Sequence, residues 1–269
     1  MSGGDSVGIE LALFGDPVEH SLSPVIHQAA LEAVGLVGTY RAVRVDADGF
    51  REACVELRAG RWHGANVTMP HKRLASRETD ERSRGADRSG SVNTIVVDGS
   101  RLIGHSTDID GVQRVWQEAG LPEDAPVLVL GAGGAAAAAL IGLESHDLFL
   151  SARRWAAAQR LAEKIDVHLH PVPWGGAIPD AVVVNATPLG MRGEALPPGL
   201  VEGSAGLLDM AYRHGETPAV RTAHQLALPC GSGTDLLVAQ ATVSFTLWTG
   251  KPAPVAEMRT AVQKAQATG

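Results

Sequence analysis

The sequence predicts an α/β protein with two units, each built on a largely parallel sheet. Short β-branched runs alternate with alanine-rich amphipathic stretches along most of the chain, which is the pattern of βαβ units. The length of 269 residues exceeds the usual size of one domain. With 45% hydrophobic and 20% charged residues, the composition is that of a packed globular protein and argues against disorder, collagen and coiled coil.

Charge and hydropathy limit the classes of partner. The chain has 23 Lys and Arg against 30 Asp and Glu, so its net charge of -7 has the wrong sign for holding a phosphate backbone. We therefore expect no nucleic-acid partner. We also expect no membrane partner and a cytoplasmic location, because neither a basic leader with an apolar run nor a membrane-length apolar window is found. Cys54 and Cys230 lie far apart without a partner motif and are expected to be core thiols.

The first half of the chain opens with a strand at 11–14, a loop at 16–21 and a helix from Ser23, and further strands are expected at 40–45 and 64–68. Ser23 is predicted to cap this helix, with Pro24 in its first turn. That cap leaves the hydroxyl of Ser21 unexplained. Two hydroxyls at a helix N-terminus are compatible with a small carboxylate, and hence with an anionic substrate.

A second polar segment, Asn66 to Lys72, follows the strand at 64–68 and again places Pro at a helix start. A lysine in a first helical turn is unfavourable for the helix dipole, so Lys72 needs another reason to be there. Lys72 and Asp108 could form a pair tuned for proton transfer, although charged loop residues are commonly just solvated. His71 is expected on the helix surface.

The second half of the chain begins with a helix at 108–118, which ends at Gly120-Leu121-Pro122. Strands are expected at 127–130, 148–151, 181–184 and 207–210, and the alanine run 135–139 is expected to form a helix close to a strand. A helix at 235–248 is expected to pack back on the first domain. These elements predict a domain of residues 1–107 completed by 237–269, and a second domain of residues 108–236.

The opening of the second domain is a strand, a glycine-rich turn and a helix start. The turn Gly131-Ala132-Gly133-Gly134-Ala135-Ala136 has small residues where a backbone would approach a pyrophosphate, and the helix N-terminus offers free N–H groups. About 20 residues beyond Gly131, the next strand ends in Arg153-Arg154 without a carboxylate. Two guanidiniums suit a 2′-phosphate, so the sequence predicts NADP rather than NAD. The alternative is that both arginines are ordinary solvated residues.

Taken together, the polar motifs resemble the shikimate dehydrogenase family. The resemblance runs in order from about Leu13 to Gly250 and is carried by Ser21-Leu-Ser23-Pro24, Asn66-Val-Thr68-Met-Pro70-His-Lys72, Ser91-Val-Asn93-Thr94, Thr107-Asp108, Gly131-Ala-Gly133-Gly134-Ala135, Asn185-Ala-Thr187-Pro-Leu-Gly190-Met191 and Gln240-Ala241. It implies an N-terminal α/β substrate domain, an NADP-binding Rossmann domain, and the reversible NADP-dependent reduction of 3-dehydroshikimate to shikimate in aromatic amino acid (chorismate) biosynthesis.

The resemblance also implies roles for single residues. Lys72 and Asp108 would be the catalytic pair. The substrate would be bound by Ser21, Ser23, Asn66, Thr68, Asn93, Thr107, Tyr212 and Gln240. The cofactor would be bound by Gly131, Ala132, Gly133, Gly134, Ala135, Arg153, Arg154, Asn185, Thr187, Met191 and Gly233.

Several positions depart from the family pattern. Ser106 stands where an Asn usually precedes Thr-Asp, and His214 replaces the usual Pro after Tyr212. Asp235 lies in a stretch that usually reads Gly-Leu-Gly-Met-Leu, and its negative charge could weaken the binding of an anionic substrate if it faces inward. The usual Asn-Arg-Thr reads Ala152-Arg153-Arg154.

These departures leave alternatives open. One is a quinate/shikimate dehydrogenase with broader substrate or cofactor use. Another is a catalytically weak paralogue that binds the nucleotide or substrate, although Lys72 and Asp108 favour the enzyme. The sequence predicts no metal site, because the pair His168 and His170 has no carboxylate or thiolate motif nearby. A monomer or a homodimer is expected.

Overall fold

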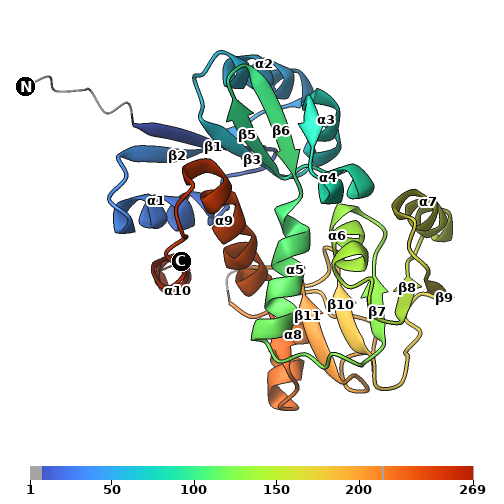
Figure 1. Cartoon of the computed structure of the whole chain (residues 1–269). Coiled ribbons are helices and arrows are strands. Elements are labelled where there is room, and N and C mark those ends of the chain that lie inside the picture. Colours follow the sequence, from blue (N-terminus) through green and yellow to red (C-terminus); the bar gives the residue numbers. More distant parts are fainter. Residues whose placement is uncertain (1–7, 214, 269) are drawn as a thin grey trace, which may run out of the picture. The chain divides into compact units, whose positions relative to one another are not determined.

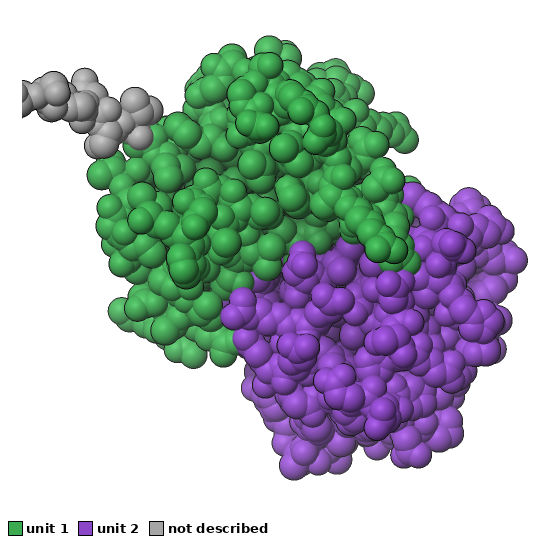
Figure 2. Space-filling view, viewed as in Figure 1, with its two compact units in different colours: residues 1–107, 241–269 green, residues 108–240 purple. Residues whose placement is uncertain are grey.

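The computed structural model describes residues 8–213 and 215–268, and Figure 1 shows the order of its helices and strands. The chain divides into two compact units, coloured separately in Figure 2: residues 1–107 with 241–269, and residues 108–240. Within the described residues each unit holds one six-stranded sheet. The predicted α/β class is therefore confirmed, and we describe each unit by itself.

The sheet of the first unit is mixed. Its strands are β1 Ile9–Gly15, β2 Gly38–Arg44, β3 Gly64–Val67, β4 Glu81–Arg82, β5 Thr94–Asp98 and β6 Arg101–His105. The strand order is β2-β1-β3-β5-β6-β4, with parallel pairing of β1 to β2 and β3 and antiparallel pairing of β5 to β3 and β6. The expectation of a parallel sheet is wrong for the β5–β6 part, because Gly99 at φ 61° forms a tight turn after Asp98.

The helices of the first unit follow from local signals in the sequence. They are α1 Ser23–Ala33, α2 Ala47–Arg58, α3 Lys72–Glu78, α4 Arg84–Ser89, α10 Val255–Thr268 and the last part of α9 Gly233–Thr249. Asp46 caps α2 by accepting a hydrogen bond from Gly49 N at 2.9 Å, and Ser83 caps α4 in the same way. Edge-to-face contacts of Phe14 with Phe50 and Trp62 lie in the core between α2 and the sheet.

The C-terminal part of the chain, residues 241–269, belongs to the first unit. In α9, Phe245 is fully buried and the indole N–H of Trp248 donates to the carbonyl of Ile95 at 2.9 Å. The final helix, α10, packs against α1. No helix among the described residues is long and apolar enough to cross a membrane.

The second unit has an all-parallel sheet. Its strands are β7 Val127–Leu130, β8 Leu148–Ser151, β9 His170–Val172, β10 Val182–Asn185, β11 Gly206–Asp209 and β12 Cys230–Gly231. They lie in the order β12-β11-β10-β7-β8-β9. Two predicted strands match their observed bounds, and two others are offset by one residue. Parallel pairing aligns the carboxyl ends of β7, β8, β10 and β11, which is the edge where such sheets bind ligands.

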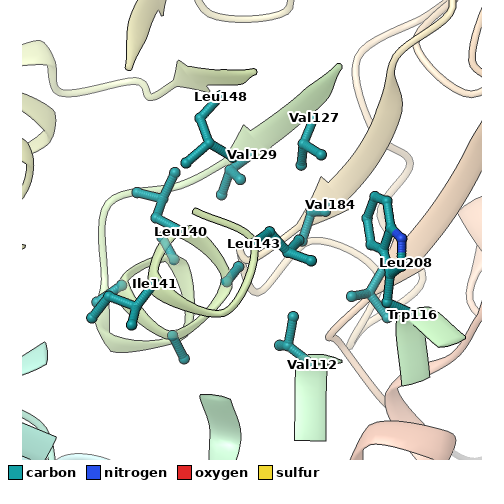
Figure 3. Packing of buried hydrophobic residues seen from close by; sticks show 14 of the residues in the cluster. Val112, Trp116, Val127, Val129, Leu140, Ile141, Leu143, Leu148, Val184 and Leu208 are labelled. Atoms are coloured by element: carbon teal, nitrogen blue, oxygen red, sulfur yellow. The ribbon is translucent and has the colours of Figure 1, made fainter. Parts of the chain in front are cut away.

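Helices cover this second sheet through an apolar core (Figure 3). In α5 (Thr107–Glu118), Val112 and Trp116 belong to the same buried cluster as Val129. In α6 (Gly134–Gly142), residues 136–139 are alanines that are almost fully buried, so the helix can approach the strands closely. The remaining helices are α7 Trp155–Ile165 and α8 Pro218–Gln225.

Candidate functional site

At the start of α1, the serine that bonds to the helix backbone is not the one predicted. Leu22 occupies the N-cap position, and Ser23 is the first helical residue. The Oγ of Ser21 accepts a hydrogen bond from Ser23 N at 3.2 Å. The prediction that Ser23 caps the helix is therefore wrong, because the bend before it brings the Ser21 hydroxyl to the first helical N–H. Pro24 does lie in the first turn, and Ser23 is buried.

Lys72 is the first residue of α3, and the chain on either side of it is anchored. His71, the N-cap residue, is buried with its ring stacked on Phe50, and its Nε2 lies 2.8 Å from the carbonyl of Val45. The expectation of a surface histidine is therefore wrong, because Val45, which follows β2, and Phe50 of α2 enclose this ring. Val92 N donates to the Lys72 carbonyl at 3.0 Å. The backbone of Lys72 is thus held in place while its side chain is half-buried.

A buried polar network joins several of the predicted substrate-binding residues. Asn66 Oδ1 accepts from the hydroxyl of Tyr40 at 2.7 Å, and its Nδ2 donates to Thr94 Oγ1 at 3.0 Å and to Ser244 Oγ at 3.2 Å. The oxygens of Thr94 and Ser244 lie 2.8 Å apart. Asn66 is therefore held by partners from β2, β5 and α9.

The same network extends to the start of α5. Asn93 Nδ2 donates to Thr107 Oγ1 at 2.9 Å, and its Oδ1 accepts from Thr107 N at 2.8 Å. Thr107 Oγ1 lies 3.3 Å from Ser244 Oγ. The structure thus brings Asn66, Asn93 and Thr107 together. Sequence reasoning missed Tyr40 and Ser244, although Ser244 follows Gln240 by one helical turn and so shares its face.

Three further residues lie where a strand ends or a helix begins, namely Thr68 after β3, Ser106 after β6 and Asp108 in α5. Thr68 follows β3, is half-buried, and donates its N–H to the carbonyl of Phe14 at 2.9 Å. Ser106, which replaces the Asn usual in the family, is buried. Asp108 is half-buried in the first turn of α5, where the helix dipole favours a negative charge. Lys72 belongs to the first unit and Asp108 to the second.

The glycine-rich turn of the second unit has the geometry of a phosphate cradle. Gly131 has φ 117°, and a Cβ there would lie 2.8 Å from the carbonyl oxygen of Ala186, so only glycine fits. Gly133 is the N-cap of α6, is exposed, and has open space where a side chain would stand. The first N–H groups of α6 receive no side-chain cap from Gly133. This turn therefore fits the pyrophosphate of a dinucleotide.

Two arginines follow β8, the strand whose end lies beside the glycine turn. Gly131 N donates to the carbonyl of Ser151, the last residue of β8, at 2.9 Å, so the strand end lies beside the glycine turn. Arg153 and Arg154 follow after Ala152 and are exposed. Neither forms an ion pair with an acidic side chain in the described parts of the chain. Two unneutralised guanidiniums thus stand where NAD-binding domains carry a carboxylate.

A second polar network lies beyond β10. Asn185 Oδ1 accepts from Thr187 N at 3.1 Å and from Thr187 Oγ1 at 2.7 Å, and Asn185 Nδ2 donates to the carbonyl of Leu189 at 2.9 Å. Nδ2 also donates to Oδ1 of Asp209 at 2.8 Å. Asp209 was missed by sequence reasoning, although an acidic residue at the end of an apolar strand was a usable signal. The structure brings Asn185 and Thr187 together.

The start of α9 explains one departure from the family pattern. Asp235 Oδ2 accepts from the N–H and the hydroxyl of Ser232 at 3.0 and 2.6 Å, and Ser232 Oγ accepts from Asp235 N at 3.2 Å. This reciprocal pair is a capping box. The carboxylate of Asp235 is therefore engaged by the start of its own helix. A Cβ on Gly233 would lie 2.3 Å from the carbonyl oxygen of Ala211, which leaves no room for a side chain.

The remaining predicted residues are scattered over the second unit. Gln240 is buried, and its Nε2 donates to the carbonyl of Leu237 at 3.0 Å. Tyr212 is half-buried, whereas Met191 exposes 39% of its surface. Ala132, Gly134 and Ala135 are half-buried in or next to the glycine turn. His214 lies outside the described residues.

Among the described residues, the histidine pair at 168 and 170 and the two cysteines form neither a metal site nor a reactive thiol. His170 lies 3.2 Å from Asp147, and its ring meets that of His168, but His168 precedes β9 rather than sharing its face. No group of three ligating side chains that could hold a metal forms there or elsewhere in the described chain.

Burial raises the pKa of both Cys54 and Cys230 to about 12, so both thiols stay protonated and unreactive at neutral pH.

Family models match both ends of the chain. Residues 13–95 match the shikimate dehydrogenase substrate binding domain, and residues 233–263 match the shikimate 5′-dehydrogenase C-terminal domain. Among curated proteins, the shikimate dehydrogenase (NADP(+)) of Salinibacter ruber is 40% identical, over 94% of this chain and 96% of its own length. The protein of the same name from Desulfitobacterium hafniense is 35% identical, over 95% and 98%.

Solved structures of shikimate dehydrogenases are also similar to this chain over almost its whole length. The chain is similar to shikimate 5-dehydrogenase from Thermus thermophilus in complex with NADP(H) and shikimate, with a TM-score of 0.88 and 33% identity. That alignment covers 96% of this chain and 99% of the other. Shikimate 5-dehydrogenase from Listeria monocytogenes, in complex with shikimate and NAD, aligns with a TM-score of 0.84 and 27% identity, over 97% and 99% of the two chains.

Proposed function

Because this chain belongs to the shikimate dehydrogenase family, we propose that it catalyses the reversible NADP-dependent reduction of 3-dehydroshikimate to shikimate. It would thus be an oxidoreductase acting on a CH–OH group, in the chorismate pathway to aromatic amino acids. The observation that carries the proposal is the pairing of an uncapped glycine turn with two unneutralised arginines just after the next strand. This pairing supports a dinucleotide that bears a 2′-phosphate.

The proposed cofactor residues form three groups, each of which binds a different part of NADP. The turn formed by Gly131, Ala132, Gly133, Gly134 and Ala135 holds the pyrophosphate, and Arg153 and Arg154 hold the 2′-phosphate. Asn185, Thr187, Met191 and Gly233 line the nicotinamide end. The loop after β10 is internally hydrogen-bonded, which supports a preformed wall there.

The proposed substrate residues present hydroxyl and amide groups. Ser21 and Ser23 bind the substrate carboxylate, with Tyr212 facing it, while Asn66, Thr68, Asn93 and Gln240 bind the ring hydroxyls and Thr107 orients the site. The network through Asn66, Asn93 and Thr107 supports this assignment because it fixes the direction of each amide before substrate arrives. An analogue that lacks a hydroxyl leaves such groups unpaired and is rejected.

Lys72 and Asp108 are the proposed catalytic pair. NADPH, when bound, supplies the hydride that adds to the ketone carbon. Protonated Lys72 stabilises the charge that develops on the ketone oxygen and gives that oxygen a proton. Asp108 keeps Lys72 in place and shares the proton. In the oxidation direction the same groups accept the proton from the substrate hydroxyl.

We further propose that the protein acts in the cytoplasm, as a monomer or homodimer, on a small-molecule substrate and without nucleic acid. The pathway assignment supports the location, and the net charge of -7 opposes binding to a phosphate backbone.

The proposal is tested by following absorbance at the reduced-nicotinamide band with purified protein, using shikimate or quinate with NADP or NAD in all four pairings. We expect rapid turnover with shikimate and NADP. Faster turnover with quinate and NAD would replace the proposal with the broader quinate/shikimate activity. No turnover in any pairing, from protein shown to be folded by circular dichroism, would favour the nucleotide-binding paralogue.

A further inference from the structure

Asp209, the last residue of β11, is a fully buried carboxylate with three hydrogen-bond donors. Oδ1 accepts from Asn185 Nδ2 at 2.8 Å and from Ala211 N at 3.1 Å, and Oδ2 accepts from Thr217 Oγ1 at 2.5 Å. No basic side chain pairs with it among the described residues. Burial raises the pKa of this carboxyl, and the three donors oppose that change. A carboxylate in such a place needs a reason beyond the packing of the sheet.

The three donors come from three separate segments at the carboxyl edge of the sheet. Asn185 ends β10, Ala211 follows β11, and Thr217 caps α8 by accepting from Val220 N at 3.2 Å. Asp209 therefore ties together the loops that follow two neighbouring parallel strands. This is the edge at which parallel sheets bind ligands.

Asp209 also decides which way the amide of Asn185 points. An amide can be turned by 180°, which exchanges its oxygen and nitrogen. The carboxylate accepts only from Nδ2, so Oδ1 must face Thr187, where it accepts from that residue's N–H and hydroxyl. With Asn185 turned around, two donors would face each other at Thr187. The fold of loop 186–191 thus depends on a carboxylate some twenty residues further along the chain.

The loop also rests on the segment that Asp209 holds. A Cβ on Gly190 would lie 3.2 Å from Cβ of Thr217, so the backbone next to Met191 packs directly on the cap of α8. Ala211, whose N–H is bound to Asp209, precedes Tyr212. Asp209 is therefore bonded to Asn185 and, through it, connected to Thr187. Through Thr217 it supports Gly190, next to Met191, and through Ala211 it holds the chain before Tyr212.

We infer that Asp209 is a positioning residue for hydride transfer, which holds the loop along the nicotinamide and the segment bearing Tyr212 in one arrangement. This inference rests on the proposed function, because the roles of Met191 and Tyr212 come from it. Displacement of a reacting group by about 1 Å can lower turnover by about 100-fold. Loss of Asp209 therefore acts on turnover more than on retention of the cofactor, whose phosphates are held elsewhere.

The test compares Asp209→Ala with Asp209→Asn and with Leu207→Ala. Leu207 is fully buried in the same strand and makes no side-chain hydrogen bond, so Leu207→Ala matches the loss of packing. We expect Asp209→Ala to lower kcat by about 10- to 100-fold while the Kd for NADP changes by less than about 3-fold. Asp209→Asn should restore most of kcat, because Oδ1 is kept and the new amide can donate to Thr217 Oγ1.

A second readout is independent of catalysis. Hydrogen exchange at the amides of Thr187 and Leu189 should quicken in Asp209→Ala but not in Leu207→Ala. If wild type is inactive, the proposed function fails, and this exchange alone decides the role of Asp209 in the loop.

An active wild type together with an unchanged kcat in folded Asp209→Ala would overturn the inference. An equal fall of kcat in Leu207→Ala would also overturn it, since general loss of packing would then explain the effect. If Asp209→Ala does not fold, Asp209→Ser keeps a small polar side chain at the position and gives the same comparison.

Discussion

At the scale of the residue, the proposed substrate groups are fixed by one another before any ligand binds. Asn66 is bonded at its oxygen and at its nitrogen, and Asn93 holds both the N–H and the hydroxyl of Thr107. Groups that are already oriented lose little freedom when a substrate arrives. The selectivity of such a site therefore follows from the direction of its amides.

Lys72 is the residue on which turnover should depend most. Replacing it with Ala removes the proposed proton donor, so we expect kcat to fall by about 100- to 10,000-fold with little change in the Kd for NADP. Steady-state kinetics and a direct NADP titration measure the two quantities. Lys251→Ala, at an exposed position of the same unit, is the matched control. Undiminished turnover in Lys72→Ala would remove Lys72 from the mechanism.

Arg153 and Arg154 should set the choice of cofactor. Hydrogen bonds to a charged group are worth about 1.5–3 kcal/mol each, so the loss of one from each arginine in the double change to Ala should lower kcat/KM with NADP by about 100- to 10,000-fold. We expect kcat/KM with NAD to change by less than about 3-fold. Arg221→Ala, an exposed arginine in α8, serves as the control. A parallel loss with both cofactors would show that the pair does not read the 2′-phosphate.

At the scale of the element, α9 shows how a local rule accounts for an unusual residue. Ser232 and Asp235 cap its start reciprocally, and later turns of the same helix supply Gln240 and Ser244. The negative charge of Asp235 also lies at the helix end that favours anions. Asp235 thus has a structural reason to be there that is independent of the substrate.

Replacement of Asp235 with Ala should therefore act on stability. Loss of the cap should lower the free energy of unfolding by about 1 kcal/mol, with Asp235→Asn retaining most of it because the amide oxygen can still accept. Chemical denaturation measures both variants, and the KM for shikimate should change by less than about 2-fold. A marked fall in that KM for both variants would instead show that the charge of Asp235 repels the substrate.

At the scale of the whole molecule, stability should depend on pH through the buried imidazole of His27. His27 is fully buried, with its ring stacked on that of Tyr40 at 4.5 Å and tilted against that of Trp248 at 5.1 Å. Its two nitrogens have no hydrogen-bond partner among the described residues. Burial lowers the pKa of His27 to about 3 from its ordinary value of 6.5. The folded protein therefore keeps His27 neutral where the unfolded chain binds a proton.

The sign of the effect follows from that difference. Between about pH 6.5 and pH 3 the unfolded state binds the extra proton, so the free energy of unfolding should fall as the pH is lowered, by up to about 1.4 kcal/mol per pH unit. Urea denaturation at pH values of about 7.5, 5.5 and 4.5 measures this slope. His27→Phe keeps a flat ring against Tyr40 but cannot bind a proton. We therefore expect this variant to lose most of the pH dependence of the free energy of unfolding that His27 contributes. Equal slopes for both proteins would show that His27 is protonated in the folded state.

Much of the fold follows from local patterns in the sequence. The strands at 127–130 and 148–151 have the predicted bounds, and the helix expected at 108–118 begins one residue earlier. Apolar runs bounded by turn residues explain this success, because both signals act over a few residues. The β5–β6 hairpin was not predicted, although Asp98-Gly99 is a turn signal. The roles given to single site residues stay predictions.

By itself the sequence determined the α/β class, the glycine turn with its free helix end, the two arginines after the following strand, and the family. Each of these depends on residues that are close together in the chain. Only the tertiary structure decided that His71 is buried, that Ser21 rather than Ser23 meets the helix N–H, and that Asn66 and Asp209 are the centres of hydrogen-bond networks. The physical reason is that a buried polar group must find its partners wherever the fold brings them, and Asn66 finds Ser244 across 178 positions of the sequence.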